Sequence, residues 1–255
     1  MSNLDISKEE ALVIFHEMIV PQIIQGATPK EKEAFILGGQ PGSGKSALAR
    51  EIIKKDRNII FINGDDLRAY HPKYYFYLKE NDEEAADKTQ AVCNLWVELL
   101  MQECLRLELN FMIEGTLRRK EVSLNTAKIM KDADYSVNLA VVSIPYELSL
   151  LSLQYRYEEL KKLGQPARFT KKESHDEAFR NSEETLKVLL DSGFFSKFYV
   201  YKRHLGRFME NVFTKEQKDM VLNSFLEGRM RKVENSEKDV PVFPKEGGLN
   251  SFICK

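Results

Sequence analysis

The sequence is poor in cysteine and carries no large excess of charge of either sign. Its 255 residues include three cysteines, Cys93, Cys104 and Cys254, and no CxxC pair. A disulfide framework or a zinc site is therefore not expected, and a reducing compartment fits best. The 39 acidic residues nearly balance the 38 basic ones, for a formal net charge of -1. Without a broad basic surplus, duplex nucleic acid is not an expected partner, although a local basic site stays open.

Long apolar runs are also absent. No segment approaches the roughly 20 apolar residues that a membrane span needs, and the first ten residues, MSNLDISKEE, lack the pattern of a targeting signal. We therefore expect no membrane partner and a cytoplasmic location. The segment from about 236 to 255 is polar and rich in proline and glycine, which predicts a surface tail.

Short apolar runs instead alternate with helical patterns along the chain. The expected strands cover residues 33–39, 59–63, 111–115, 138–145 and 198–203. The expected helices cover residues 47–55, 83–109, 120–132, 146–163 and 172–192, after an N-terminal helix that opens with a capping box at 7–10 and is interrupted at Pro21. This alternation predicts a three-layer α/β fold, with a central parallel sheet covered by helices on both faces. We expect residues 1–235 to form a single domain.

Residues 39–46 read GQPGSGKS, which is the pattern G-x-x-x-x-G-K-S between an expected strand and an expected helix. Glycines at these positions let backbone N–H groups turn toward phosphate oxygens, at the positive end of the helix dipole. Lys45 is expected to reach the β- and γ-phosphates, and the Ser46 hydroxyl to ligate Mg²⁺. The predicted nucleotide-binding residues are Gly39, Gln40, Pro41, Gly42, Ser43, Gly44, Lys45, Ser46 and Ala47. The motif alone does not separate kinases from motors and switches.

Charged residues follow the expected strands. Asp65 comes after IIFING and Glu114 closes FMIE, and ligands of parallel sheets lie beyond these carboxyl ends, so both acids are predicted to face the phosphates. Asp66 is better explained as a turn or helix-cap residue. For Arg156 and Arg168 two interpretations stay open at this point. They belong either to a solvated charged face or to the neutralisation of a transferred phosphoryl group.

Five segments together resemble one family. GGQPGSGKS, NGDDLRAYHP, IEGTLR, RYEEL and AR-x-T-K-K-E-x-H-D occur in this order within about residues 33–180, and they resemble the zeta-toxin family of bacterial toxin–antitoxin systems. Members of this family are P-loop kinases that use ATP or GTP with Mg²⁺. They phosphorylate the 3′-hydroxyl of the amino sugar of UDP-N-acetylglucosamine, which depletes a cell-wall precursor. The resemblance therefore implies a three-layer P-loop kinase fold, and a small helical, epsilon-like antitoxin as a partner that blocks the nucleotide site.

The resemblance also implies roles for single residues. Asp65 is the base that accepts the proton of the sugar hydroxyl, while Lys45 and Ser46 serve the nucleotide and the metal. Arg156 and Arg168 flank the transferred phosphoryl group from a lid-like segment at about 150–180. The implied lining of the substrate pocket is Asp65, Glu98, Glu114, Thr116, Arg118 and Thr126, with Arg68 as either a substrate contact or a loop-fixing residue.

Two alternatives to this function remain at the level of sequence. The chain could be a P-loop kinase of another small hydroxyl substrate, such as a nucleoside, a sugar, an antibiotic or a polynucleotide end. It could also be a non-catalytic, nucleotide-dependent binding protein, which would require a degenerate acceptor site. Asp65, Glu114, Thr116 and Arg118 show no such degeneration.

Overall fold

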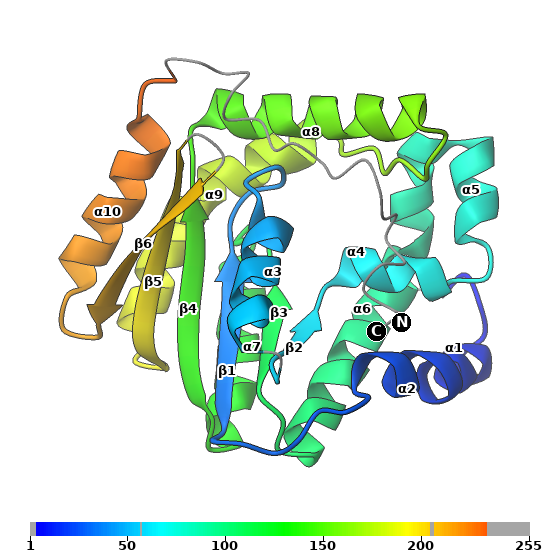
Figure 1. Ribbon diagram of the computed structural model, residues 1–255, viewed down its shortest axis with the longest axis horizontal. Coiled ribbons are helices and arrows are strands. Elements are labelled where there is room, and N and C mark those ends of the chain that lie inside the picture. The colour runs from blue at the N-terminus through cyan, green and yellow to red at the C-terminus, as the bar shows by residue number, and fades with distance from the viewer. Residues whose placement is uncertain (1–3, 57, 205–206, 234–255) are drawn as a thin grey trace.

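The computed structural model describes residues 4–56, 58–204 and 207–233, and its centre is a six-stranded sheet (Figure 1). The strands are β1 (Glu33–Gly38), β2 (Ile60–Ile62), β3 (Phe111–Glu114), β4 (Ser136–Ser143), β5 (Phe195–His204) and β6 (Arg207–Thr214). Their order is β2-β3-β1-β4-β5-β6, and the first five are parallel. The predicted parallel sheet is therefore confirmed for the five expected strands.

The sixth strand corrects the prediction of a purely parallel sheet, because β6 runs antiparallel to β5 at the sheet edge. β6 was not predicted, because its apolar residues show no clear alternation. Met209 and Val212 are exposed, and only Phe213 is buried along this strand. An edge strand with one buried side chain gives little periodic signal.

Helices cover both faces of the sheet, as predicted. They are α1 (Lys8–Ile14), the π-helical η1 (Phe15–Ile19), α2 (Val20–Ile23), α3 (Lys45–Lys55), α4 (Gly64–Leu67), the 3₁₀ turn η2 (Arg68–Tyr70), α5 (Tyr74–Glu80), α6 (Asp82–Arg106), α7 (Lys120–Asp132), α8 (Tyr146–Lys162), α9 (Lys172–Asp191) and α10 (Lys218–Met230). One core packs α1, α6, α7, α9 and α10 against the sheet, and a smaller core packs α3 and α8 against the opposite face (Figure 1). The short α4, α5 and α10 were not predicted.

The central strand β4 shows why both faces are covered. Val137, Leu139 and Val141 belong to the larger core, while Ala140 and Val142 belong to the smaller one. Because successive side chains of a strand point to opposite faces, a continuous apolar run buries both. This arrangement places the ends of the parallel strands along one edge of a rigid, two-sided core.

The N-terminal helix differs from the expectation at its end. The Ser7 hydroxyl accepts a hydrogen bond from the Glu10 N–H at 3.0 Å, which confirms the helix start. Pro21, however, does not interrupt the helix, because the helical backbone runs on to Ile23 after a π-helical segment. Proline fits near the start of a new helical segment, where no helical acceptor is needed for its missing N–H. Trp96 of α6 donates to the Ala11 carbonyl oxygen at 2.9 Å and fixes this helix to the larger core.

The carboxyl ends of four neighbouring strands lead into the segments that carry the predicted site. β1 leads to the glycine-rich loop, β2 to α4, β3 to the loop at 115–119, and β4 to α8. In the described part of the chain, no helix is both long and apolar enough to cross a membrane. The predicted tail at 236–255 and the domain boundary near 235 lie outside the described residues.

Candidate active site

The glycine-rich loop has the backbone that its sequence predicts. Gly44, directly before α3, has a φ of 97°, a left-handed conformation that favours glycine. Gly42 has a φ of 78°, and a Cβ atom there would lie 2.1 Å from the carbonyl oxygen of Ser149. The loop therefore rests directly on the backbone of α8, and a side chain at Gly42 would push the two apart.

Lys45 and Ser46 form one cluster with Glu114. The Lys45 ammonium donates to the carbonyl oxygens of Gly39 at 2.8 Å and Gln40 at 3.1 Å, and its Nζ lies 3.7 Å from Oε1 of Glu114. The Ser46 hydroxyl donates to Oε2 of Glu114 at 3.0 Å. Burial lowers the pKa of Lys45, and the carboxylate of Glu114 opposes that shift. A buried ammonium at the start of a helix is well placed to neutralise phosphate charge.

This cluster fits a magnesium ion that is shared with a nucleotide. A serine hydroxyl and a carboxylate are oxygen ligands, and Mg²⁺ is commonly held by one or two carboxylates together with substrate phosphates. Among residues 4–56, 58–204 and 207–233, no group of three or more His, Cys, Asp or Glu side chains could hold a metal by itself. Ser46 and Glu114 therefore suit an ion whose remaining ligands come from phosphate and water.

Asp65 lies across from this cluster, at the start of α4. The side chain of Asn63 caps this helix by accepting from the Asp65 N–H at 2.9 Å. The Asp65 carboxylate accepts from Arg68 Nε at 3.3 Å through Oδ1 and pairs with Arg168 Nη1 through Oδ2. Burial favours the neutral acid, yet the guanidinium groups of Arg168, Arg68 and Arg156 hold the pKa of Asp65 below its ordinary value. Asp65 is therefore ionised at neutral pH, as a proton acceptor must be.

Arg68 anchors Asp65 to α6. Its side chain is buried, with 1% of the residue exposed, and it donates to the Ala86 carbonyl oxygen at 2.7 Å, to Thr89 Oγ1 at 2.6 Å and to Gln90 Oε1 at 2.5 Å. All three acceptors belong to α6. Of its two predicted roles, the geometry favours the loop-fixing one, because the guanidinium is enclosed by the protein. The substrate contact of Arg68 stays a prediction.

The structure brings Arg156 and Arg168 to the same place. Arg168, between α8 and α9, pairs directly with Asp65. Arg156 lies two-thirds of the way along α8, where burial and the charge of Arg168 lower its pKa while Asp65 and Glu114 oppose the shift. Both guanidinium groups thus act electrostatically on Asp65, and the interpretation as a solvated charged face does not fit Arg156 or Arg168.

A comparison with models of known protein families identifies the family of this chain. The family model described as zeta toxin matches residues 22–245. The chain belongs to the zeta toxin family. The family resemblance inferred from the sequence is thereby confirmed.

Curated relatives of this zeta toxin family member cover nearly the same length. Toxin PezT of Streptococcus pneumoniae serotype 4 is 33% identical over 228 residues, which cover 89% of this chain and 88% of PezT. Toxin zeta of Enterococcus hirae is 28% identical over 241 residues, which cover 87% and 84% of the two chains.

Solved structures agree with this assignment. A chain from the PezAT chromosomal toxin–antitoxin system of S. pneumoniae superimposes with a TM-score of 0.77 at 26% identity, over 93% of this chain and 94% of that one. A chain from the AvrRxo1-ORF1:ORF2 complex with ATP superimposes with a TM-score of 0.55 over 89% of this chain and 75% of that one. Its identity of 13% supports the fold alone.

Of the four further residues implied by the family pattern, two contact the protein's own helices and two are exposed. Arg118 pairs with Glu177 of α9 at 3.6 Å, and the Thr126 hydroxyl donates to a backbone carbonyl one turn earlier in α7. Glu98 is exposed on α6, and Thr116 is exposed in the loop after β3. A role in binding substrate stays a prediction for all four residues.

Asp66 was predicted to be a turn or helix-cap residue, and it lies in the first turn of α4. It does not cap α4, because Asn63 does. Burial and the nearby carboxylates of Glu114 and Asp65 raise the pKa of Asp66 to about 7, against the effect of Arg50. Asp66 therefore lies between the two halves of the site. The only signal in the sequence was its position beside Asp65 at the end of a strand.

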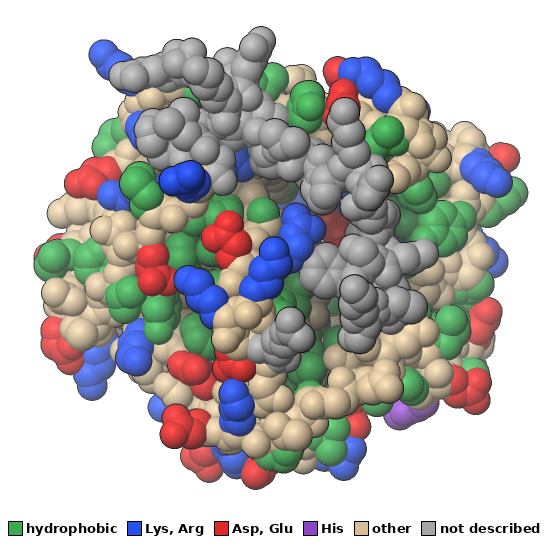
Figure 2. Space-filling model, viewed as in Figure 1, with side chains coloured by type: hydrophobic (Ala, Val, Ile, Leu, Met, Phe, Trp, Pro, Cys, Tyr) green, Lys and Arg blue, Asp and Glu red, His purple; other side chains and the backbone are tan. Residues whose placement is uncertain are grey.

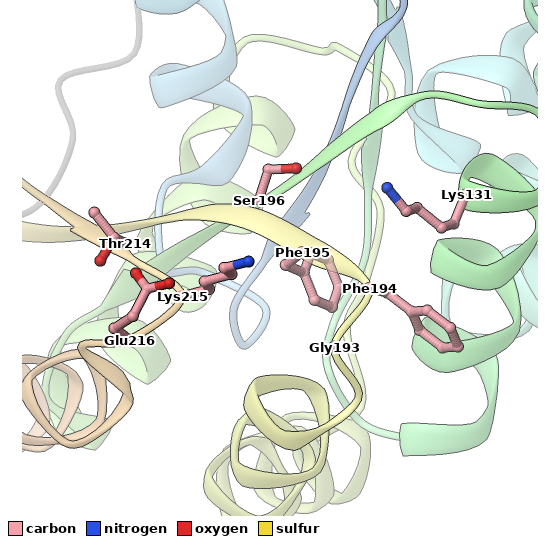
Figure 3. Close-up of a pocket in the computed structure, with 8 residues that line it drawn as sticks. All are labelled: Lys131, Gly193, Phe194, Phe195, Ser196, Thr214, Lys215 and Glu216. Atoms are coloured by element: carbon pink, nitrogen blue, oxygen red, sulfur yellow. The ribbon is translucent and has the colours of Figure 1, made fainter.

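Other surfaces of the molecule carry none of the predicted site residues. A cavity of about 280 Å³ lies at the start of β5 and the end of β6, at the amino ends of the strands (Figure 3). It is lined by Lys131, Gly193, Phe194, Phe195, Ser196, Thr214, Lys215 and Glu216. Over the described part of the face in Figure 2, basic and acidic side chains are mixed rather than gathered into one broad basic patch.

Proposed function

We propose that this protein is a P-loop kinase that transfers the γ-phosphoryl group of ATP or GTP to the 3′-hydroxyl of the amino sugar of UDP-N-acetylglucosamine. The observation that supports it best is the ionised Asp65 carboxylate, held by Arg68 and Arg168 opposite the Lys45–Glu114 cluster. A site that only bound nucleotide would have no need of a second, ionised carboxylate that is fixed by two arginines. Family membership supports the choice of substrate.

The proposed reaction uses the two sides of the site together. The sugar hydroxyl oxygen attacks the γ-phosphorus, the bond from that phosphorus to the bridging oxygen breaks, and the nucleoside diphosphate leaves. Asp65 accepts the hydroxyl proton, for which it keeps free lone pairs beside its two arginine contacts. Lys45, Arg156 and Arg168 balance the negative charge that spreads over the transferred group.

Magnesium belongs to the proposal as the ion that Ser46 and Glu114 would hold. When bound, Mg²⁺ neutralises charge on the β- and γ-phosphate oxygens. Glu114 has two further roles that need no metal. It accepts a hydrogen bond from the Ser46 hydroxyl, and it stabilises the Lys45 ammonium. The family pattern also assigns Glu114 a contact with the sugar nucleotide.

The biological role follows from the family rather than from the site. We infer a bacterial toxin that depletes a cell-wall precursor and is held inactive by a small helical antitoxin over the nucleotide site. The relative in the PezAT toxin–antitoxin system supports such a partner. Expression of the chain alone is expected to stop growth, and the Asp65→Asn variant is expected to be harmless. Equal toxicity of the unmodified protein and the variant would show that kinase activity is not the cause.

The decisive test is a transfer assay with the purified protein, Mg²⁺, ATP or GTP and UDP-N-acetylglucosamine, followed by mass spectrometry. We expect a singly phosphorylated sugar nucleotide, and a loss of about 10³-fold in kcat for Asp65→Asn, since a general base typically contributes 10² to 10⁴ or so. Nucleotide binding should persist in that variant. Asp191→Asn, an exposed aspartate paired with Lys218, is the matched control.

The alternatives named above give distinct results in the same assay. A panel of nucleosides, free sugars, aminoglycosides and polynucleotide ends would reveal another acceptor by a higher kcat/KM. Binding of nucleotide without transfer to any acceptor would favour a non-catalytic protein.

A further inference from the structure

His175 and Asp176 close the motif AR-x-T-K-K-E-x-H-D, yet the proposed reaction uses neither. His175 lies in the first turn of α9 and is fully buried. Its Nε2 lies 2.8 Å from Oγ of Ser149, a fully buried residue in the first turn of α8. Its Nδ1 lies 3.3 Å from Oδ1 of Asp176. The motif thus joins the start of α9 to the start of α8.

The same chain of hydrogen bonds continues to the glycine-rich loop. The Gln40 side-chain N–H donates to Ser149 Oγ at 3.4 Å and to the Ile144 carbonyl oxygen at 3.1 Å. At its other end, the Asp176 carboxylate accepts from the Tyr146 hydroxyl at 2.7 Å and from the Lys172 ammonium at 2.6 Å. The polar chain therefore runs from the phosphate-binding loop through α8 to α9. It is buried from Gln40 to His175 and reaches the surface at Asp176 and Lys172.

The contacts of this chain fix where the histidine proton lies. Burial lowers the pKa of His175, so its ring is neutral and carries one proton. An ionised carboxylate can only accept, so the proton belongs on Nδ1, facing Asp176. Nε2 then accepts the Ser149 hydroxyl hydrogen, and Ser149 Oγ accepts from Gln40. In the alternative arrangement, the Ser149 hydroxyl donates to the Tyr146 carbonyl oxygen at 2.8 Å, and the ring proton lies on Nε2. The lone pair of Nδ1 would then face the Asp176 carboxylate, which is unfavourable.

The chain lies where the arginine-bearing segment is attached. Arg156 follows Ser149 by seven residues, and two helical turns place both on the same side of α8, about 10 Å apart. Arg168 precedes the first residue of α9, Lys172, by four positions. The segment that carries both arginines therefore begins and ends at this hydrogen-bonded chain, next to the point where Gly42 touches the backbone of Ser149.

We propose that His175 is a positioning residue, which fixes the starts of α8 and α9 to the glycine-rich loop and thereby sets where Arg156 and Arg168 meet the transferred group. This inference rests on the proposed function. A buried polar chain resists displacement, because a hydrogen bond that breaks inside the protein is not replaced by one to water.

The first test needs no activity. In ¹⁵N-histidine-labelled protein at pH 7, the ring nitrogens of His175, assigned by their loss in His175→Gln, are expected to report a neutral ring protonated on Nδ1. Ser149→Ala should shift the Nε2 resonance, while His16→Gln, at an exposed histidine, should leave it unchanged. A ring protonated on Nε2, or a charged ring, would contradict the proposed chain of hydrogen bonds, even if the protein proves to be an active kinase.

The second test measures kinetics at a temperature where every variant remains folded. We expect His175→Leu to lower kcat about tenfold, with the nucleotide KM changed less than about twofold, because misplaced catalytic groups slow transfer more than binding. His175→Gln, whose side-chain oxygen can still accept from Ser149, should lose about threefold or less. In a background that carries both Arg156→Ala and Arg168→Ala, the His175→Leu change should cost less than about twofold, since His175 acts through these two arginines.

The outcomes separate the two proposals. An equal loss from His175→Leu in both backgrounds, or no loss in either, would reject the positioning role and leave the kinase proposal intact. If the unmodified protein phosphorylates no acceptor, the kinase proposal fails, and with it the positioning role, while the resonance test still decides whether the buried chain exists.

Discussion

The two sides of the site are built in different ways. On one side, Lys45 contacts the backbone of Gly39 and Gln40, six and five residues away. On the other, Asp65 is held by Arg168, which lies 103 residues further along the chain. The phosphate side is thus specified largely by a short motif, whereas the acceptor side exists only when α4, α6 and the α8–α9 segment are packed together. Substitutions should therefore separate binding of nucleotide from activation of the acceptor.

The largest expected effect is on the phosphate side. Lys45→Met removes the buried ammonium, and we expect kcat/KM for the nucleotide to fall roughly 10³-fold, since loss of one preorganised charge-stabilising group costs about 10² to 10³. Transfer kinetics and calorimetric nucleotide binding measure it. Lys54→Met, an exposed lysine of the same helix, should behave like the unmodified protein. Activity within tenfold of normal in Lys45→Met would show that the motif is not the nucleotide site.

Arg68→Leu tests the acceptor side. Removing a buried guanidinium leaves Asp65, Thr89 and a backbone carbonyl of α6 without their donor, so the free energy of unfolding should fall by about 3 kcal/mol. Urea unfolding measures this loss, and nucleotide affinity should stay close to normal. Arg106→Leu breaks an exposed pair with Glu103 and should cost less than about 0.5 kcal/mol. Similar losses in both variants would contradict the anchoring role of Arg68.

The difference between the two sides also explains what the sequence could predict. The glycine-rich loop and the five parallel strands follow from local patterns, since left-handed glycines and continuous apolar runs depend little on distant residues. The anchoring of Arg68 by α6 and the environment of Asp66 could not be predicted. Asp66 acquires its raised pKa from Glu114, a residue of a different strand that only the folded sheet brings near.

Asp66→Asn tests the region between the two sides of the site, where Asp66 lies. A folded-state pKa of about 7, above the ordinary 3.8, means that ionising Asp66 costs stability as the pH rises toward 7. Asparagine removes that cost. The free energy of unfolding of the variant should therefore rise, relative to that of the unmodified protein, by on the order of 2 kcal/mol between pH 5 and pH 8. Urea unfolding without Mg²⁺ and nucleotide measures it. A gain that does not depend on pH would show that Asp66 ionises normally.

The smallest expected effect concerns Arg118, whose pair with Glu177 is exposed on both partners. Arg118→Ala should change the free energy of unfolding by less than about 0.5 kcal/mol. If the loop after β3 binds the sugar nucleotide, KM for UDP-N-acetylglucosamine should rise about fivefold, as expected for one lost charged hydrogen bond at an exposed site. Glu177→Gln breaks the same pair and keeps the guanidinium, so it should leave KM unchanged. Equal KM values in all three proteins would exclude Arg118 from the substrate site.

The position of β1 in the sheet also has a consequence for how the chain matures on the ribosome. β1 lies between β3 and β4, and both of these strands come later in the sequence. The last residue of β4 is 143 − 38 = 105 residues beyond the end of β1. At about 5–20 residues per second, the first strand of the nucleotide site waits roughly 5–20 s for its neighbours to be translated. A nascent chain is thus kept without a phosphate site until more than half of it has been made.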